Sequence, residues 1–419
     1  MSENFTLVKG ARLIDGLGGP PLERGAVLMQ GTDIRAVGTE EAVAAPEGAQ
    51  VEVLDYPNMT IMPGLIDAHV HLISLGDGRA GDDMNLLADE ILTLQAAKNA
   101  RAHLYSGVTS VRDCGAKNRT TFLLREAMEM GITVGPRLVL TGRPLAIIGG
   151  HLSYFGSPAT GPTECRAQVR QLIKEGADFI KVTATGGSTR TSMRYHASFN
   201  LDELSAITDE VHKFGKHVVA HCASSDGLIN ALDAGVDTIV HAIHADGDGT
   251  YRYRPELTER LVEQKVFVNP TLHAIRHQMW FLEAKLESGE PLTGKEQADL
   301  DELKYAYGHH EDFVGRMREA GVTMVAGSDS AWLNYKMGEF QHELEGMTTV
   351  GFSPLEVLTA ATSDSARSCR IDGETGSLVE GKRGDVIVID GDPAADIASM
   401  WNVADVFQNG KKVDRGNFV

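Results

Sequence analysis

The chain has few cysteines and no long apolar run. Its four cysteines, Cys114, Cys165, Cys222 and Cys369, are scattered without a CxxC pair, which argues against a disulfide framework and fits a reducing compartment. No apolar stretch approaches the roughly 20 residues of a membrane-spanning helix. The first residues, MSENFTLVKG, lack the basic and apolar regions of a signal peptide. We therefore expect a soluble, cytoplasmic protein, although a leader removed beforehand would leave no trace in this sequence.

Positively charged side chains are also scarce. Lysine and arginine number 39 against 58 aspartates and glutamates, so the formal net charge is -19. Nucleic acids and anionic membranes bind clustered lysine and arginine, and we expect neither as a partner. The substrate is not restricted by this total, because a local site can carry the opposite sign. The hydrophobic share of 42% suffices for a large core.

A dinucleotide-binding GxGxxG fingerprint is absent after the first strand of the central region. Strand-like runs alternate there with helical stretches such as residues 202–214 and 301–320, which is the pattern of a parallel sheet. Eight such units predict a closed (β/α)8 TIM barrel of the α/β class, with a doubly wound open sheet as the alternative. The strand candidates are residues 64–71, 108–113, 137–141, 179–183, 217–221, 238–241, 266–269 and 323–327.

The two ends of the chain differ from its middle. Residues 5–62 and the tail beyond residue 372 contain short β-type runs separated by Gly- and Pro-rich turns. We expect both ends to form one small β-sandwich, residues 1–62 with 366–419, beside a barrel of residues 63–365. Residues 274–312 are too many for a plain crossover and could form a lid or a subunit contact. A homo-oligomer is expected.

The sequence PGLIDAHVH at residues 63–71 predicts half of a metal site. Its apolar start is typical of a buried strand, and it ends on His69 and His71. Side chains at i and i+2 point to the same side of a strand, so both imidazoles emerge together at its carboxyl end. Neutral imidazoles are common metal ligands. A single HxH pair is often incidental, and the hypothesis depends on the other strand ends.

Four further candidates lie where predicted strands end. Lys181 ends the fourth strand, His221 the fifth and His241 the sixth, and Asp329 follows the eighth in GSDS. The carboxyl ends of barrel strands meet at one rim, where such folds build their active sites. His244 competes with His241, but the alternation places His241 at the strand end and His244 in the following loop. Each residue has an ordinary structural interpretation by itself, and their joint placement favours a metal site.

This arrangement resembles the amidohydrolase superfamily of metal-dependent hydrolases, over nearly the whole chain because the flanking sandwich matches too. The resemblance implies two divalent metal ions, usually zinc, bridged by a carbamylated lysine at the end of strand four. The implied ligands are His69, His71 and Asp329 for one ion, and His221 and His241 for the other, with the carbamate of Lys181 between them.

A carbamate would explain the lysine among these ligands. A lysine ammonium has no lone pair and cannot bind a cation, whereas reaction of the amine with carbon dioxide gives an anion whose two oxygens can bridge two cations. Solvent polarised by both ions becomes hydroxide near neutral pH. Asp329 is then placed to take the catalytic proton and to deliver it to the leaving amine.

Substrate contacts are predicted in two loops and after strand seven. His151 follows strand three in GGHLSYFG, where similar enzymes contact a substrate carbonyl or carboxylate, and we assign it to catalysis and substrate binding. The loop after strand four carries a local positive cluster in an acidic protein, which predicts recognition of a substrate carboxylate; a solvated loop is the alternative. His273 could line the pocket. The members of the loop cluster are Arg190, Arg194, Tyr195 and His196.

Three other features are expected to be structural or supporting. Asp67 either orients the ligands of the first strand or simply ends that strand. His309 and His310 lie on a predicted helix and are expected at its surface. Asp202 and Glu203 are typical of the first turn of a helix.

The VHA, PTL and GSDS contexts most resemble the prolidase-like and imidazolonepropionase-related branch, which includes Xaa-Pro dipeptidases, N-acyl amino acid carboxypeptidases and ochratoxin-type amide hydrolases. We expect a binuclear enzyme that cleaves an amide bond next to a carboxylate in a small molecule. The alternatives are cyclic amide hydrolysis, as in hydantoinases and dihydroorotases, and lactone or phosphotriester hydrolysis. A non-catalytic scaffold is disfavoured because scaffolds usually lose ligands. Lys181 argues against the mononuclear deaminases.

Overall fold

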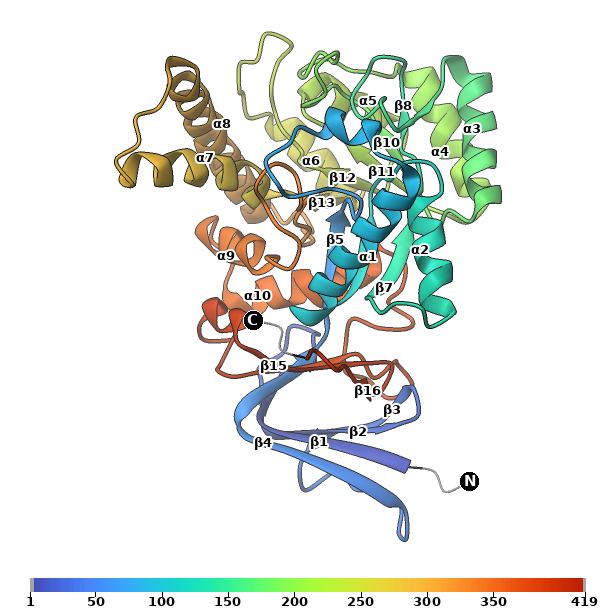
Figure 1. Cartoon of the computed structure of the whole chain (residues 1–419), viewed down its shortest axis with the longest axis vertical. Coiled ribbons are helices and arrows are strands. Elements are labelled where there is room, and N and C mark those ends of the chain that lie inside the picture. Colours follow the sequence, from blue (N-terminus) through green and yellow to red (C-terminus); the bar gives the residue numbers. More distant parts are fainter. Residues whose placement is uncertain (1–3, 417–419) are drawn as a thin grey trace.

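Two regions follow one another along the long axis of the molecule (Figure 1). In the computed structural model, which describes residues 4–416, strands from both ends of the chain lie at one end and the α/β middle lies at the other. The chain leaves the β-rich end through β4 (Gln50–Pro63) and returns to it at β14 (Val386–Ile389). The predicted α/β architecture with a small β-sandwich from both termini is confirmed.

The sandwich is built from seven strands in the order β16-β15-β14-β4-β1-β2-β3. β1 is antiparallel to β2 and parallel to β4, and β14 is antiparallel to β4. Alternating residues pack between the layers, including Val8, Met29 and Val388. β4 runs directly into the first barrel strand, so the sandwich fixes where the barrel begins. The remaining strands are β1 (Asn4–Leu13), β2 (Leu22–Gln30), β3 (Asp33–Thr39), β15 (Val403–Gln408) and β16 (Lys411–Lys412).

Seven parallel barrel strands agree with the predicted ranges to within one residue at each end. β5, β6 and β7 pair in one sheet and β10 to β13 in another. β8 (Leu145–Ala146) and β9 (Ser157–Pro158) are short additions beside β10. The seven strands are β5 (Leu65–Val70), β6 (Val108–Asp113), β7 (Arg137–Leu140), β10 (Ile180–Thr183), β11 (Val218–His221), β12 (Thr238–Val240) and β13 (Phe267–Asn269).

The eighth predicted strand, residues 323–327, is not a continuous strand. Its backbone still joins the two neighbouring strands, because Val325 N donates to Val268 O at 2.9 Å on one side and Ala68 N donates to Ala326 O at 3.0 Å on the other. On the opposite side of the ring, Asp178 N donates to Leu140 O at 2.7 Å, between β7 and β10. These bonds connect the two sheets around a buried interior.

Helices cover the outside of this ring (Figure 1). α4 begins with a capping box in which Asn200 and Glu203 satisfy each other's backbone N–H groups, so Glu203 lies in the first turn as expected. The helices are α1 (Asp89–Tyr105), α2 (Thr120–Glu129), α3 (Gly161–Glu175), α4 (Leu201–Lys213), α5 (Ser225–Asp233), α6 (Pro255–Glu263), α7 (Leu272–Glu287), α8 (Gly294–Glu319), α9 (Gln341–Thr349), α10 (Pro354–Thr359) and α11 (Ser365–Ser368), with short turns η1 (Gly81–Leu86), η2 (Ala360–Asp364) and η3 (Ile397–Trp401).

The long stretch at residues 274–312 forms a helical hairpin. α7 and α8 pack side by side and project from the barrel (Figure 1), and Lys285 Nζ lies 2.6 Å from Glu296 Oε1 between them. The surface expectation for His310 was wrong, because α8 turns this residue toward the barrel, where its Nε2 lies 2.8 Å from Pro270 O. His309 is half-buried against Tyr305.

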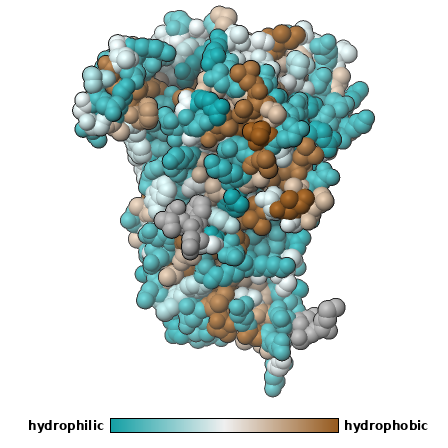
Figure 2. All heavy atoms as spheres, viewed as in Figure 1, coloured by the Kyte–Doolittle hydropathy of each residue, from teal (hydrophilic) through white to brown (hydrophobic). Residues whose placement is uncertain are grey.

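Several large apolar side chains are exposed on one side of the barrel. They include Ile91 and Leu94 of α1, and Met130, Ile132 and Val134 after α2. Figure 2 shows brown, hydrophobic spheres on the face where these two helices lie. Within residues 4–416, no helix is both long and apolar enough to cross a membrane. All four cysteines are free and buried, which agrees with the expected lack of a disulfide framework.

Candidate active site

One cavity of about 330 Å³ contains every predicted metal ligand. These predicted ligands come from β5, β10, β11, the end of β12 and the segment that follows residue 327. The strand order brings together side chains that are up to 260 positions apart in the sequence. The predicted ligands that line this cavity are His69, His71, Lys181, His221, His241 and Asp329.

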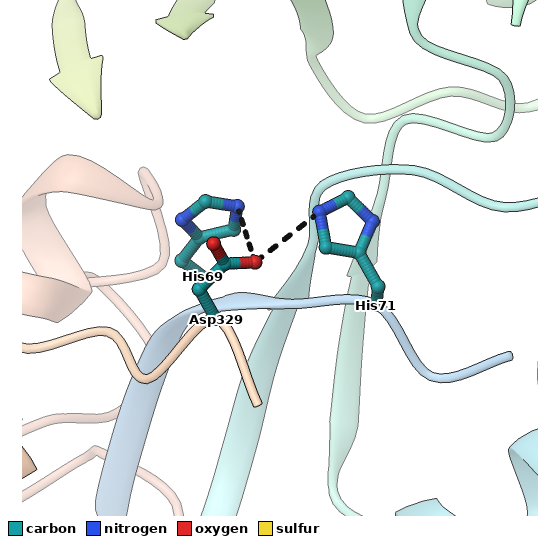
Figure 3. A group of neighbouring side chains, drawn as sticks. All are labelled: His69, His71 and Asp329. Carbon is teal, nitrogen blue, oxygen red and sulfur yellow. Dashed lines mark ion pairs between the residues drawn. The ribbon is translucent and has the colours of Figure 1, made fainter. Parts of the chain in front are cut away.

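His69, His71 and Asp329 form the tightest group (Figure 3). Nε2 of each imidazole lies 3.6 Å from Oδ1 of Asp329, and the ligand atoms of all three lie within 4.8 Å of one another. The two rings come from β5 and its carboxyl end, with centroids 5.3 Å apart. Asp329 reaches them from the segment after residue 327. The backbone N of Asp329 donates to His69 O at 2.7 Å.

Hydrogen bonds on the far ring nitrogens decide which nitrogen faces the cavity. Nδ1 of His71 lies 2.9 Å from Gly115 O, and a carbonyl can only accept, so this nitrogen carries the proton. Nδ1 of His69 lies 3.2 Å from Oδ1 of Asn269. The amide nitrogen of Asn269 donates to Gly327 O at 3.0 Å, which leaves its oxygen as the acceptor. Nε2 of both imidazoles is therefore free to donate a lone pair.

The other two histidines, His221 and His241, leave different ring nitrogens free for a metal ion. Nε2 of His221 lies 2.9 Å from Gly186 O, which leaves Nδ1 as its lone-pair nitrogen. Nδ1 of His241 lies 2.6 Å from Oγ1 of Thr271, and that hydroxyl donates to Pro270 O at 2.7 Å, so Nε2 of His241 is free. The two rings lie 4.6 Å apart. The sequence predicted both residues, but the tautomers follow only from these backbone contacts.

Burial keeps these imidazoles neutral. Desolvation lowers the pKa of His71 to about 3 and the pKa values of His69, His221 and His241 well below the ordinary value. A neutral imidazole is the form that binds a metal. Desolvation also raises the pKa of Asp329 to about 7, against the opposing effect of Lys181 and of a hydrogen bond from Trp332.

Lys181 is fully buried and is the second residue of β10 (Ile180–Thr183), so it lies within the strand and does not end it as predicted. Its Nζ lies 3.3 Å from Nε2 of His69, and among the described residues it forms no ion pair with a carboxylate. Desolvation is the main cause that lowers the pKa of this amine. A buried cation without a counterion is costly, so the site favours either the neutral amine or an anionic derivative of it.

The backbone bends sharply where the site residues leave the strands. His241, Thr271 and Asp329 have φ angles of +68°, +52° and +50°, in the left-handed region that non-glycine residues rarely adopt. Such conformations persist where the surrounding structure enforces them, and they cluster at functional sites. Here they turn the side chains of His241 and Asp329 into the cavity.

Asp67 supports the site through the backbone and not through the ligand rings. Its carboxylate accepts from His69 N at 3.1 Å, from Ser328 N at 2.9 Å and from His103 Nε2 at 3.1 Å. It therefore joins the end of β5 to the segment that carries Asp329. Of the two expected roles of Asp67, support of the ligands applies, and not merely ending the strand. Asn269 and Trp332 also support the ligands and were not predicted.

His151 lies at the cavity wall beside the second histidine pair. Its ring is 4.4 Å from that of His221, and its Nδ1 lies 3.1 Å from Oγ1 of Thr189. The ring packs so closely on Gly187 that a Cβ there would come within 2.6 Å of it. Burial lowers the pKa of His151 to about 3, so it faces the cavity as a neutral imidazole.

The loop after β10 is only partly in the cavity. Arg190 and Arg194 line it, whereas Tyr195 and His196 are not among its lining residues. Arg190 already pairs with Asp83 at 3.2 Å, while Arg194 forms no ion pair among the described residues. Tyr195 instead packs on Tyr251, and His196 is exposed.

The structure places His273 behind the cavity wall. Its ring stacks on His342 with centroids 4.5 Å apart, and it is not a lining residue. His277, one helical turn later on α7, lines the cavity in its place, together with His310. The i, i+4 spacing would have revealed His277 once α7 was recognised as a helix beginning at Leu272.

The family comparison supports the same conclusion as this geometry. Residues 60–413 match the model of the amidohydrolase family. The chain belongs to the amidohydrolase family. As a member of it, the protein is a hydrolase that acts on amide bonds, and the predicted resemblance is confirmed.

Several members of the family are similar over nearly the whole length of the chain. Ochratoxinase of Aspergillus niger is 28% identical over 97% of this chain and 84% of its own length. The structure of a Xaa-Pro dipeptidase with methionine in its active site superposes with a TM-score of 0.84 at 25% identity, covering 98% of this chain and all of that one. A prolidase bound to N-methylphosphonate-L-proline gives a TM-score of 0.82 at 27% identity, with coverages of 98% and 100%.

Proposed function

We propose that this amidohydrolase is a binuclear zinc enzyme that cleaves an amide bond next to a free carboxylate, as in dipeptides, N-acyl amino acids or ochratoxin-type amides. The observation that carries the proposal is the convergence of four neutral imidazoles, a carboxylate and a buried lysine in one cavity, with the unpaired guanidinium of Arg194 at its wall. Relatives described as a dipeptidase, a prolidase and an ochratoxinase support this substrate class.

The donor atoms suit two divalent cations. His69, His71 and Asp329 would hold one ion through Nε2 atoms and a carboxylate oxygen that already lie 3.6 Å apart. His221 and His241 would hold the other, through the ring nitrogens that their hydrogen bonds leave free. Nitrogen and oxygen ligands with a position left for substrate are typical of catalytic zinc. When bound, the ions supply Lewis-acid polarisation of a carbonyl and of water.

Lys181 would complete both coordination spheres as a carbamate. Burial favours its neutral amine, which is the form that reacts with carbon dioxide. The carbamate would add a second negative charge beside that of Asp329. We propose this modification as the link between the two histidine groups.

Proton transfer and substrate binding would then fall to Asp329 and to residues around the ligands. Asp329 would accept the proton of the attacking water and pass it to the leaving nitrogen. His151 would donate to the carbonyl oxygen of the substrate. Arg194, and less directly Arg190, would bind the substrate carboxylate through charge-assisted hydrogen bonds.

We further propose that the enzyme works as a homo-oligomer in the cytoplasm. Exposed apolar side chains on α1 and after α2 support a subunit contact, and four free buried cysteines suit a reducing compartment.

The test is a substrate panel for the zinc-loaded enzyme. N-acyl amino acids and dipeptides are compared with their methyl esters, and with a hydantoin, a dihydropyrimidine, a lactone and a phosphotriester as the rival classes. We expect the free acids to have the highest kcat/KM. Faster hydrolysis of a cyclic amide, lactone or phosphotriester would replace the proposed substrate class.

A further inference from the structure

A second chamber, at the α7–α8 hairpin, shares part of its wall with the active-site cavity. This chamber has a volume of about 480 Å³ and is lined by both helices, which lie side by side in Figure 1. A substrate that extends beyond its scissile amide and carboxylate could therefore reach the hairpin. The residues that line both spaces are Arg194, Ile275, His277, Gln278 and Leu333.

The chamber combines an apolar wall with carboxylates. Phe281, Leu282 and Leu303 supply apolar surface. Of its three carboxylates, Glu296 is paired with Lys285, but Asp299 and Glu302, three positions apart on α8, make no ion pair or hydrogen bond within residues 4–416. Arg194, at the junction, is the one cationic side chain among the described lining residues. Such a space suits an apolar stem that ends in a positive group.

His277 adds an independent observation at the junction. Its side chain is 8% exposed, and its Nδ1 lies 3.1 Å from His273 O. Because a carbonyl only accepts, Nδ1 carries the ring proton, and Nε2 is left as a lone-pair acceptor. Nε2 has no hydrogen-bond partner among the described residues. Buried polar atoms are normally paired, so this acceptor is available to an N–H donor of a bound substrate.

We infer that this chamber recognises a cationic arm of the substrate, with its stem on Phe281 and Leu282 and with the N–H groups of its positive head shared between Nε2 of His277 and the carboxylates of Asp299 and Glu302. This inference rests on the proposed function, because the arm is part of the amide substrate. It makes His277 a residue that determines specificity. The substrate class becomes an amide with a carboxylate near the metal residues and an ammonium or guanidinium group beyond them.

Substrates of matched length test the preference for a cationic arm. Dipeptides with a common leucine partner carry lysine, norleucine or 2-aminoadipate as the variable residue, once at the N-terminus and once at the C-terminus. These side chains have similar length and differ in terminal charge. In the series that enters the chamber, we expect lysine to exceed norleucine by about 10-fold in kcat/KM, the low end for a charge-assisted contact, and 2-aminoadipate to be poorest. Norleucine equal to or better than lysine in both series would overturn the inference.

Charge-matched variants of the hairpin locate the preference. Asp299→Asn with Glu302→Gln removes the two unpaired carboxylates of the chamber. Glu287→Gln with Asp301→Asn removes two charges from the same helices outside it. We expect the first pair to abolish the lysine preference and the second to keep it. His277→Phe should reduce kcat/KM several-fold for the lysine substrate and leave that for the norleucine substrate nearly unchanged. Equal losses on both substrates, or a preference that survives the chamber variant, would contradict the assignment.

A binding measurement separates this inference from the proposed function. Calorimetric titration of the metal-loaded protein compares n-hexylguanidinium with 1-hexanol, neither of which contains an amide to hydrolyse. Tighter binding of the guanidinium, lost in the Asp299→Asn and Glu302→Gln variant, supports the chamber even if no dipeptide is cleaved. Cleavage of dipeptides without any such binding difference would keep the proposed function and overturn the chamber.

Discussion

The inner part of the cavity and its outer wall are built in different ways. The predicted metal residues lie in or directly after barrel strands and are buried or nearly so. Three of their imidazoles are bonded to a backbone carbonyl or an amide oxygen by the nitrogen that faces away. The outer arginines, Arg190 and Arg194, lie in an exposed loop. Within residues 4–416, Arg190 has an ion-pair partner and Arg194 has none. Strand register therefore fixes the chemistry, while the loop and the hairpin are free to select the substrate.

The largest expected effect comes from the inner part. Asp329→Asn keeps the shape and an oxygen ligand but removes the carboxylate that we propose moves the proton. General acid–base catalysis is worth about 10²–10⁴-fold, so kcat/KM for an amide should fall by at least 10²-fold while much of the metal is retained. The defect should shrink for an activated ester, whose leaving group needs no proton. Near wild-type turnover of amides would assign proton transfer to another group, with His151 the first to test.

The outer wall should respond more weakly and with more selectivity. Arg194→Ala should lower kcat/KM for a free acid by about 10- to 150-fold, the value of a charge-assisted hydrogen bond, and much less for its methyl ester. Arg190→Ala should cost less, because that guanidinium is occupied by Asp83. Kinetics on paired acid and ester substrates measure both. Equal losses on acid and ester would remove the carboxylate role from Arg194.

A substitution at Trp332 should have a smaller effect on turnover, and only through the inner part of the cavity. Its Nε1 donates to Oδ1 of Asp329 at 2.8 Å, and its ring packs 4.9 Å from that of His71. Trp332→Phe keeps the packing and removes the donor, which should lower kcat about 10-fold with KM little changed. Trp280→Phe is the control, because Trp280 lies on α7 outside the cavity lining. A KM effect without a kcat effect would make Trp332 a substrate contact instead.

His244 should have the smallest effect on turnover. Its Nδ1 accepts from Arg254 N at 3.1 Å, and burial lowers its pKa to about 4. As the pH falls below the unfolded value near 6.5, the unfolded chain takes up the proton first, so stability is lost between pH 6.5 and about 4. The shift corresponds to about 3 kcal/mol.

A comparison of variants at His244 and His241 tests which of the two histidines binds metal. His244→Asn should keep its metal and flatten that part of the unfolding free energy against pH, whereas His241→Asn should lose metal. Metal analysis and denaturant titration at several pH values distinguish the two. If His244→Asn lost metal and His241→Asn did not, the two assignments would have to be exchanged.

The sequence revealed what depends on alternation and strand order. His69 and His71 were predictable because i and i+2 share a side of β5, and His221, His241 and Asp329 because parallel strands end at one rim. The eighth strand was less regular than expected, since a few backbone bonds suffice to close the ring there. His310 was wrongly expected at the surface and His277 was not predicted, because the direction of both side chains depends on how α7 and α8 pack. Tyr195 and His196 show the same limit in a loop, whose path depends on contacts made with Tyr251 and other distant residues.

Lys181 tests the central claim most directly, because we propose that it joins the two groups of ligands. Metal content is measured by mass spectrometry for the wild type and for Lys181→Ala, each prepared with zinc and bicarbonate and assayed on the same amide. We predict two zinc ions per wild-type chain, and for Lys181→Ala a loss of most bound metal and activity that short carboxylic acids partly restore. Two ions and normal turnover in Lys181→Ala would contradict the bridged binuclear site.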